Sequence, residues 1–329
     1  MKIALLGPSH PFRGGIVHFN SLLAEVLQNK AQLEVDLFYW SKPYPAFLLP
    51  GSSSDYLDGK SVLTFSRPGL HILKYTNPVT WIKLARYIKR GQYDLFITHW
   101  VHPVHFPVFK FLFTAIKLTT KTKICLIVHN CLPHERFFSD AVLSRNLFNT
   151  AHRLVMHGQP ETELAGRIGV DSYKLIKAFH PLYNQFHLPN ESRESIRQRL
   201  GLGKKVLLFF GFIRPYKGLD LLLKAFCELS PKYKDLSLLI VGEQFGSSVD
   251  QLSEKEKFLK GCPSNDPVRG RVVWIDHYVA NEEVGHYFTV ADALVAPYLS
   301  VTQSGPIQIA YAFDKPVIAS DLPAFRECV

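Results

Sequence analysis

Short apolar runs alternate along the chain with segments whose apolar residues recur at helical spacing. The runs of the first half that predict strands are Ile3–Leu6, Val35–Tyr39, Val62–Phe65, Leu95–Thr98, Ile124–Val128 and Arg153–Met156. Amphipathic patterns over residues 16–28 and 78–89 predict helices between them. Strands that alternate with helices predict a parallel sheet with helices on both faces.

A second series of strands and helices begins near residue 204. Its predicted strands are Val206–Phe210, Leu236–Val241, Val272–Ile275, Ala293–Ala296 and Val317–Ala319, and its helices cover 219–229, 282–290 and 305–313. Between the two series, residues 179–199 are rich in proline, asparagine and charge, which predicts a linker with its break near residue 190. We therefore expect two α/β domains, residues 1–190 and 191–329.

One segment, residues 42–60, does not fit this alternation. It holds three prolines and a run of three serines, together with Tyr44 and Phe47. Long loops with apolar tips are often functional lids. We favour the plainer alternative, a loop that packs on its own domain.

The chain has 329 residues, 47% of them hydrophobic, and a formal net charge of +10. A basic balance predicts an anionic partner such as a nucleotide, a phosphate or an acidic lipid surface. Nucleic acid is disfavoured, because the basic residues belong to no known nucleic-acid-binding module. The five cysteines form no CxxC pair, and no leader-like or membrane-spanning run of about 20 apolar residues occurs. We expect a cytoplasmic protein with reduced thiols.

Two glycine turns follow predicted strands and open helices. Gly14-Gly15 follows the first strand, and the segment 211–218 follows the strand Val206–Phe210 and carries Arg214 and Lys217. Neither is a GxGxxG or a P-loop sequence, which disfavours a dehydrogenase and a P-loop NTPase. Two cations at a helix start oppose the helix dipole unless an anion lies between them, so the second turn predicts a phosphate site.

Polar residues also follow two further strands, at the edge where parallel sheets place ligands. His129 and Asn130 follow the strand Ile124–Val128, with His134 and Glu135 on the loop beyond. A metal on His129 and His134 is an alternative that Pro133 disfavours, since it argues against a helix. Ser304 is a candidate N-cap of the helix that begins at Gly305. The free amides at this helix start suit a second phosphate contact, and the alternative is an ordinary capped helix.

Basic residues gather on one predicted helix of the first domain. Lys83, Arg86 and Lys89 share a face of the helix over 78–90. Such helices can lie on anionic membranes, although a solvated face explains this helix by itself. Peripheral contact with the inner face of a membrane is thus kept as an alternative.

Taken in order, these motifs resemble the glycosyltransferases of GT-B fold, specifically the retaining family 4, over essentially the whole chain. The matching segments are Gly14-Gly15, His129-Asn130, residues 211–218, Ala296-Pro-Tyr, Gln303-Ser-Gly305 and Asp314-Lys-Pro. The resemblance implies two Rossmann-like domains facing across a cleft. The first would be the acceptor side, and the second would bind the nucleotide-sugar donor.

The resemblance also implies roles for single residues. Arg214 and Lys217 would hold the diphosphate of a UDP- or GDP-sugar, and His129 would contact the transferred sugar. Further substrate contacts would come from Gly14, Gly15, Asn130, Glu243, Tyr278, Gln303, Ser304 and Gly305. The family needs no metal and no cofactor, retains the configuration of the sugar, and would here serve a glycan or lipid-linked acceptor.

The chain departs from the family at two points. Val301 and Ile309 stand where the family usually carries two glutamates, as in a divergent Gln-Ser-Gly branch, and Gln303 or Gln308 are candidate replacements. Residues 321–329 resemble the segment that leads into a further helix, so we expect the usual C-terminal extension to be lacking. These departures leave two alternatives: a non-catalytic GT-B protein that binds a nucleotide or a partner, and a GT-B sugar-nucleotide epimerase.

Overall fold

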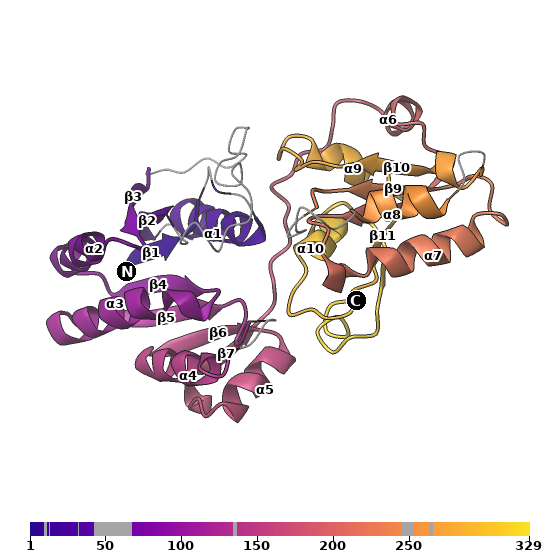
Figure 1. Ribbon diagram of the computed structural model, residues 1–329. Helices are drawn as coiled ribbons and strands as arrows, with labels where there is room; N and C mark the ends of the chain where they lie inside the picture. Colours follow the sequence, from indigo (N-terminus) through magenta and orange to yellow (C-terminus); the bar gives the residue numbers. More distant parts are fainter. Residues whose placement is uncertain are drawn as a thin grey trace. The chain divides into compact units, whose positions relative to one another are not determined.

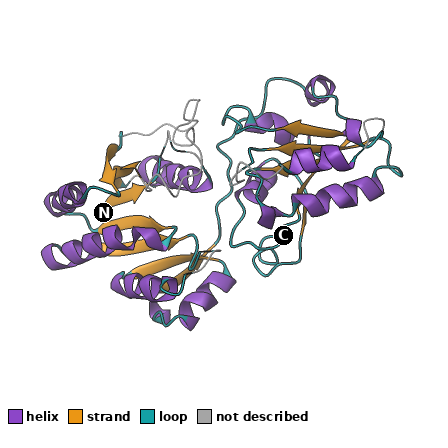
Figure 2. Ribbon diagram, in the orientation of Figure 1, coloured by secondary structure: helices purple, strands orange, loops and turns teal. Residues whose placement is uncertain are grey.

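The structure is a computed structural model that describes residues 1–9, 12, 14–31, 33–42, 68–133, 137–244, 253–262 and 266–329. The chain forms two compact units (Figures 1 and 2). Unit 1 holds the described residues up to His180, and unit 2 holds those from Pro181 to Val329. Each unit is a parallel β-sheet with helices packed on it, which confirms the predicted two-domain α/β fold class.

Unit 1 is built on a seven-stranded sheet in the order β3-β2-β1-β4-β5-β6-β7. The strands are β1 (Lys2–Gly7), β2 (Glu34–Lys42), β3 (Leu70–Lys74), β4 (Leu95–Trp100), β5 (Lys123–Val128), β6 (Arg153–His157) and β7 (Leu175–Ala178). The helices are α1 (Gly15–Glu25), which continues as a π-helical turn Val26–Lys30, α2 (Pro78–Gly91), α3 (Phe106–Thr119), α4 (Asp140–Thr150) and α5 (Gln159–Arg167). The order reverses between β1 and β4, and this is the position where doubly wound sheets bind ligands.

The apolar runs explain why these strands lie inside unit 1. Residues 3–6 of β1 are all buried, as a strand covered by helices on both faces requires. Large aromatic side chains of β4, α3 and α4 belong to the hydrophobic core of unit 1, among them Trp100, Phe109 and Phe148. The sheet is therefore a rigid platform for the residues at its carboxyl edge.

Unit 2 is built on a five-stranded sheet in the order β10-β9-β8-β11-β12. The strands are β8 (Lys205–Phe210), β9 (Leu236–Val241), β10 (Val272–Ile275), β11 (Ala293–Ala296) and β12 (Val317–Ala319). The helices are α6 (Arg193–Arg199), α7 (Leu219–Leu229), α8 (Glu254–Gly261), α9 (Val284–Val290) and α10 (Gly305–Ala312). Here the strand order reverses between β8 and β11, so the loops after these two strands start side by side.

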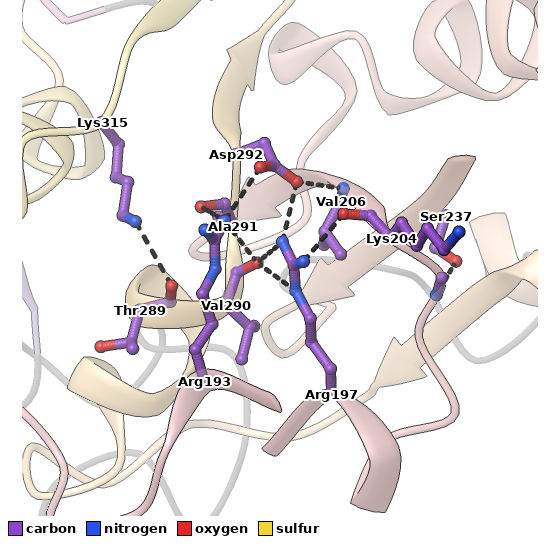
Figure 3. A network of polar contacts seen from close by, with 11 residues as sticks. Arg193, Arg197, Lys204, Val206, Ser237, Thr289, Val290, Ala291, Asp292 and Lys315 are labelled. Carbon is purple, nitrogen blue, oxygen red and sulfur yellow. Dashed lines mark hydrogen bonds and ion pairs between the residues drawn. The ribbon is translucent and has the colours of Figure 1, made fainter. Parts of the chain in front are cut away.

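A polar network ties α6 to this sheet (Figure 3). Asp292, just before β11, pairs with Arg193 at 2.9 Å and with Arg197 at 2.8 Å, and it accepts a hydrogen bond from the Val206 amide at 2.8 Å. Arg197 also donates to the carbonyl oxygens of Val290 and Lys204. The network joins α6 to the starts of the two strands that flank the reversal of strand order.

The units part between His180 and Pro181, earlier than the predicted break near residue 190. The reason is that residues after Pro181 pack on unit 2. Tyr183 is buried beside Gly305, and the His187 carbonyl lies against Gly285 with no room for a side chain. The stretch predicted to be a linker thus begins unit 2 and includes α6.

Other predictions differ in detail or lie outside the described residues. The sequence pattern missed β3, β7 and α8, and it extended α1 to residue 28 where the structure changes to a π-helical turn. The predicted strand Val62–Phe65, the loop from residue 43 onward, His134 and Glu135 lie outside the described residues.

Candidate functional site

In unit 2 the loops after β8 and β11 are in direct contact. A side chain at Gly218, whose φ is +66°, would lie 2.1 Å from the Pro297 carbonyl oxygen. The Leu299 amide donates to the Tyr216 carbonyl at 2.7 Å across the same junction. The glycine is needed on two grounds, the left-handed backbone and the close approach of the neighbouring loop. The junction places Lys217 beside Tyr298.

Lys217 ends a short 3-10 turn, Pro215–Lys217, and its side chain is buried. Its ammonium nitrogen lies 5.4 Å from the centre of the Tyr298 ring, within the range of a cation–π contact. Burial lowers the pKa of Lys217 to about 8; the Tyr216 phenol opposes the shift and the Arg214 charge adds to it. No carboxylate among the described residues contributes to this shift of the Lys217 pKa. The described residues thus place no acid beside this buried cation.

The beginning of α10 lies at the same junction. Ser304 occupies the N-cap position and is buried beside Tyr298, but its hydroxyl makes no capping hydrogen bond to the helix. The sequence placed Ser304 correctly and gave it a capping role that the structure does not bear out. Burial raises the pKa of the Tyr298 phenol to about 12, so this ring stays neutral.

The loop after β9 runs next to the loop after β8. The Ile213 amide donates to the Glu243 carbonyl at 2.9 Å, and a side chain at Gly242 would collide with the Gly211 carbonyl. Phe212 packs on Tyr278, with 5.8 Å between ring centres. Glu243 and Tyr278 are therefore joined to the segment that carries Arg214 and Lys217.

The two positions without glutamate differ in their surroundings. Ile309 is buried on α10, while Val301 is half-buried on the loop before it. Of the two candidate replacements, Gln308 is buried on α10 and Gln303 is half-buried near its start.

In unit 1, Gly14 and Gly15 begin α1 after β1. Gly14 is the N-cap residue with φ +116°, a conformation that suits glycine. Among the described residues, no atom lies within 4 Å of where a side-chain β-carbon at either glycine would stand. His129 directly follows β5 and is buried, and Asn130 next to it is half-buried.

His129 belongs to a cluster of four histidines around the Phe19 ring. They stand at the ends of four neighbouring strands and are His99, His129, His157 and His180. Their ring centres lie 5.1 to 5.7 Å from that of Phe19. Burial lowers the pKa of His99 to about 3 and of His157 to about 4, and it holds that of His129 well below its usual value.

Sequence reasoning found only His129 of this cluster. The signal available was the recurrence of histidine at the carboxyl ends of successive strands. Two nearby histidines have other contacts: His102 accepts a hydrogen bond from the Val104 amide, and His105 packs on Trp40. Within the described ranges no group of three His, Cys, Asp or Glu side chains is arranged to hold a metal ion.

Comparison with known proteins finds a family match within unit 2. Residues 204–329 match the family described as glycosyl transferases group 1. A D-inositol 3-phosphate glycosyltransferase of Frankia alni is 31% identical over 147 residues, which are 43% of this chain and 35% of that protein. A lipopolysaccharide 1,2-N-acetylglucosaminetransferase of Salmonella typhimurium is 26% identical over 200 residues, 55% of this chain and 50% of that protein.

The fold likeness extends over the whole chain. The Anabaena protein HepE in complex with UDP superposes with a TM-score of 0.71 at 16% identity, covering 100% of this chain and 83% of HepE. The chain aligns to half or less of the length of the two curated relatives. Residues 204–329 are thus similar to the glycosyl transferases of group 1, and the whole chain shares the fold of HepE.

Proposed function

We propose that the protein moves a sugar from a UDP- or GDP-sugar to a glycan or lipid-linked acceptor, with retention of configuration and without a metal or cofactor. The observation that carries this proposal is the buried Lys217 beside the start of α10, where the loops after β8 and β11 meet. A buried cation is stabilised by a partner anion, and a helix start offers amide donors to the same anion. A diphosphate satisfies both.

The proposed chemistry follows from where charge develops. When the bond between the sugar carbon and the phosphate oxygen breaks, negative charge builds on the diphosphate. Lys217 and Arg214 would stabilise that charge, an effect that is strong at a buried site. These cations would do the work that a metal does elsewhere. In the retaining mechanism the acceptor hydroxyl attacks from the face that the phosphate leaves, and the phosphate takes the acceptor's proton.

The other predicted residues have support of different kinds. No described atom crowds the β-carbon positions of Gly14 and Gly15, which suits a ligand at the start of α1. We propose that His129 and Asn130 contact the transferred sugar, and that Glu243 and Tyr278 contact the base or ribose. The donor class is supported by the UDP bound to HepE and by the glycosyltransferase names of the curated relatives.

Peripheral membrane contact is proposed through α2. Its basic residues Lys83, Arg86 and Lys89 are exposed together with Ile82 and Tyr87. Cations beside exposed apolar side chains suit an anionic lipid surface. In the described part of the chain no helix is long and apolar enough to cross a membrane. Binding to vesicles with phosphatidylglycerol, lost when the three cations become glutamate, would support the contact; equal binding to neutral vesicles would contradict it.

Slow donor hydrolysis tests the enzymatic proposal without a known acceptor. The protein is incubated with UDP- and GDP-sugars, with and without EDTA, and proton NMR follows the nucleotide and the anomeric form of the released sugar. We expect UDP or GDP to form despite EDTA, with the sugar released first in the donor's configuration. An epimerase would yield a new sugar nucleotide, and a non-catalytic protein would leave every donor intact; either result contradicts the proposal.

A further inference from the structure

The Asn20 side chain on α1 is held in one orientation. It is fully buried, and its amide nitrogen donates to the Pro8 carbonyl oxygen at 2.9 Å. Gly7 makes the room, since a side chain there would lie 2.3 Å from the Asn20 amide oxygen. Because the nitrogen is engaged by Pro8, the amide oxygen faces His99, 2.8 Å from its Nε2 atom.

This orientation determines where the two histidines carry their protons. An amide oxygen only accepts hydrogen bonds, so His99 must carry its proton on Nε2. A neutral imidazole has one N–H group, which leaves His99 Nδ1 as an acceptor. Its partner is His129 Nε2 at 3.0 Å, and this atom must therefore donate. His129 then carries its proton on Nε2, and its Nδ1 atom is unprotonated.

The surroundings keep both rings neutral. The planes of the two imidazoles are 20° apart with ring centres 5.2 Å apart, and the Phe19 ring packs edge-on against both. Burial is the main cause that lowers the pKa of each, and the nearby His157 acts in the same direction on both. A cationic form, which would reverse the hydrogen-bond directions, is disfavoured at neutral pH.

We propose that Asn20 and His99 are positioning residues that fix His129 in the Nε2–H tautomer. The consequence, which rests on the proposed function, is that His129 offers a hydrogen-bond acceptor to its ligand. It would bind a sugar hydroxyl as acceptor, and it would not serve as a proton donor. Tautomers of this kind are set by the partner of the other ring nitrogen.

Two-bond proton–nitrogen NMR spectra of the histidines in the ligand-free protein test this proposal. We expect His99 and His129 each to show a protonated Nε2 and an unprotonated Nδ1. A proton on His129 Nδ1 would overturn the proposal. The measurement needs no nucleotide, so failure of the glycosyltransferase proposal would leave its result standing.

Two variants distinguish the effect of the hydrogen-bond chain on the His129 tautomer from the effect of ring packing. Asn20→Leu removes the acceptor and should turn the His129 signals into those of mixed tautomers. Phe19→Leu loosens the ring packing but keeps the chain, and it should leave the tautomer unchanged. Mixed tautomers in Phe19→Leu with none in Asn20→Leu would refute the assigned roles. If Asn20→Leu does not fold, the spectra of the wild type and of Phe19→Leu still test the tautomer assigned to His129.

Discussion

The Lys217 ammonium nitrogen lies 5.4 Å from the centre of the Tyr298 ring, buried where the loops after two adjacent strands meet. This contact joins two segments about 80 residues apart in sequence, one after β8 and one after β11. The ring stabilises the charge without neutralising it. Among the described residues the charge meets this ring and no carboxylate, which is the basis for proposing an anion as its ligand.

Nucleotide binding should weaken at high pH because Lys217 loses its proton. Its pKa of about 8 lies within the range where this can be measured, and only the charged form attracts a diphosphate. The affinity for UDP or GDP should fall as pH rises above 8, by up to about tenfold per pH unit. Lys217→Arg should bind with little pH dependence, since arginine stays charged. Titration calorimetry at several pH values measures this, and a flat wild-type profile would count against it.

Gly218 should tolerate alanine far less well than Gly201 does. Both have φ +66°, but a side chain at Gly201 meets nothing within 4 Å, whereas at Gly218 it would lie 2.1 Å from the Pro297 oxygen. Gly201→Ala should lower the free energy of unfolding by about 1 kcal/mol from backbone strain alone. Gly218→Ala should cost several times more. Urea unfolding compares them, and equal losses would show that the two loops are not locked together.

The Asp292 network should make unit 2 less stable in acid. Burial by itself would raise the pKa of Asp292, but the Val206 amide and the Arg197 and Arg193 charges outweigh burial and lower it. The stabilisation is therefore complete above the unfolded pKa of 3.8 and is lost as pH falls through the lower folded value. At pH 7, Asp292→Asn should cost about 2 kcal/mol.

The matched control is Asp321→Asn, which removes an exposed carboxylate that also pairs with an arginine, Arg326. Exposed pairs contribute little, so this change should hardly alter urea unfolding at pH 7. The penalty of Asp292→Asn should shrink toward pH 3. A penalty independent of pH would mean that the carboxylate charge is not what stabilises α6.

Unit 1 should lose stability between pH 6.5 and 4 because of its histidine cluster. His99 and His157 have folded pKa values of about 3 and about 4, below the unfolded value of 6.5. The unfolded chain therefore binds more protons in this range, and stability present above pH 6.5 declines as pH falls. At pH 5 each ring would account for about 2 kcal/mol.

The same titration can be followed directly by NMR. The His99 and His157 ring signals should keep their neutral positions down to pH 5 in the folded protein, and should titrate near 6.5 in urea. Titration of these rings near 6.5 in the folded state would contradict the burial argument.

Most of the central strands could be predicted because their residues form nearly continuous apolar runs. The run Val206–Phe210 lies within β8, and Leu236–Val241 coincides with β9, since helices cover both faces of the sheet. β3 was missed because it is an edge strand of which only Leu73 is buried. Its pattern of burial leaves no continuous apolar run to recognise.

The site could be predicted only as far as single segments allow. Lys217 and Ser304 follow strands and were found for that reason, but their shared neighbour Tyr298 depends on the order of the strands in the sheet. The histidine cluster has the same origin, because His99, His129 and His157 lie on neighbouring strands and far apart in sequence. Nothing in the local sequence shows that the Asn20 amide completes the hydrogen-bond chain through His99 to His129.

Titration calorimetry of UDP and GDP tests the central claim most directly, using the wild type, Lys217→Met and Lys224→Met. Lys224 is an exposed lysine on the next helix, so its replacement removes the same charge away from the site. The account predicts that at least one nucleotide binds the wild type and Lys224→Met alike, and that Lys217→Met weakens it about a hundredfold. Equal affinity of all three proteins, or no binding by the wild type, would contradict it.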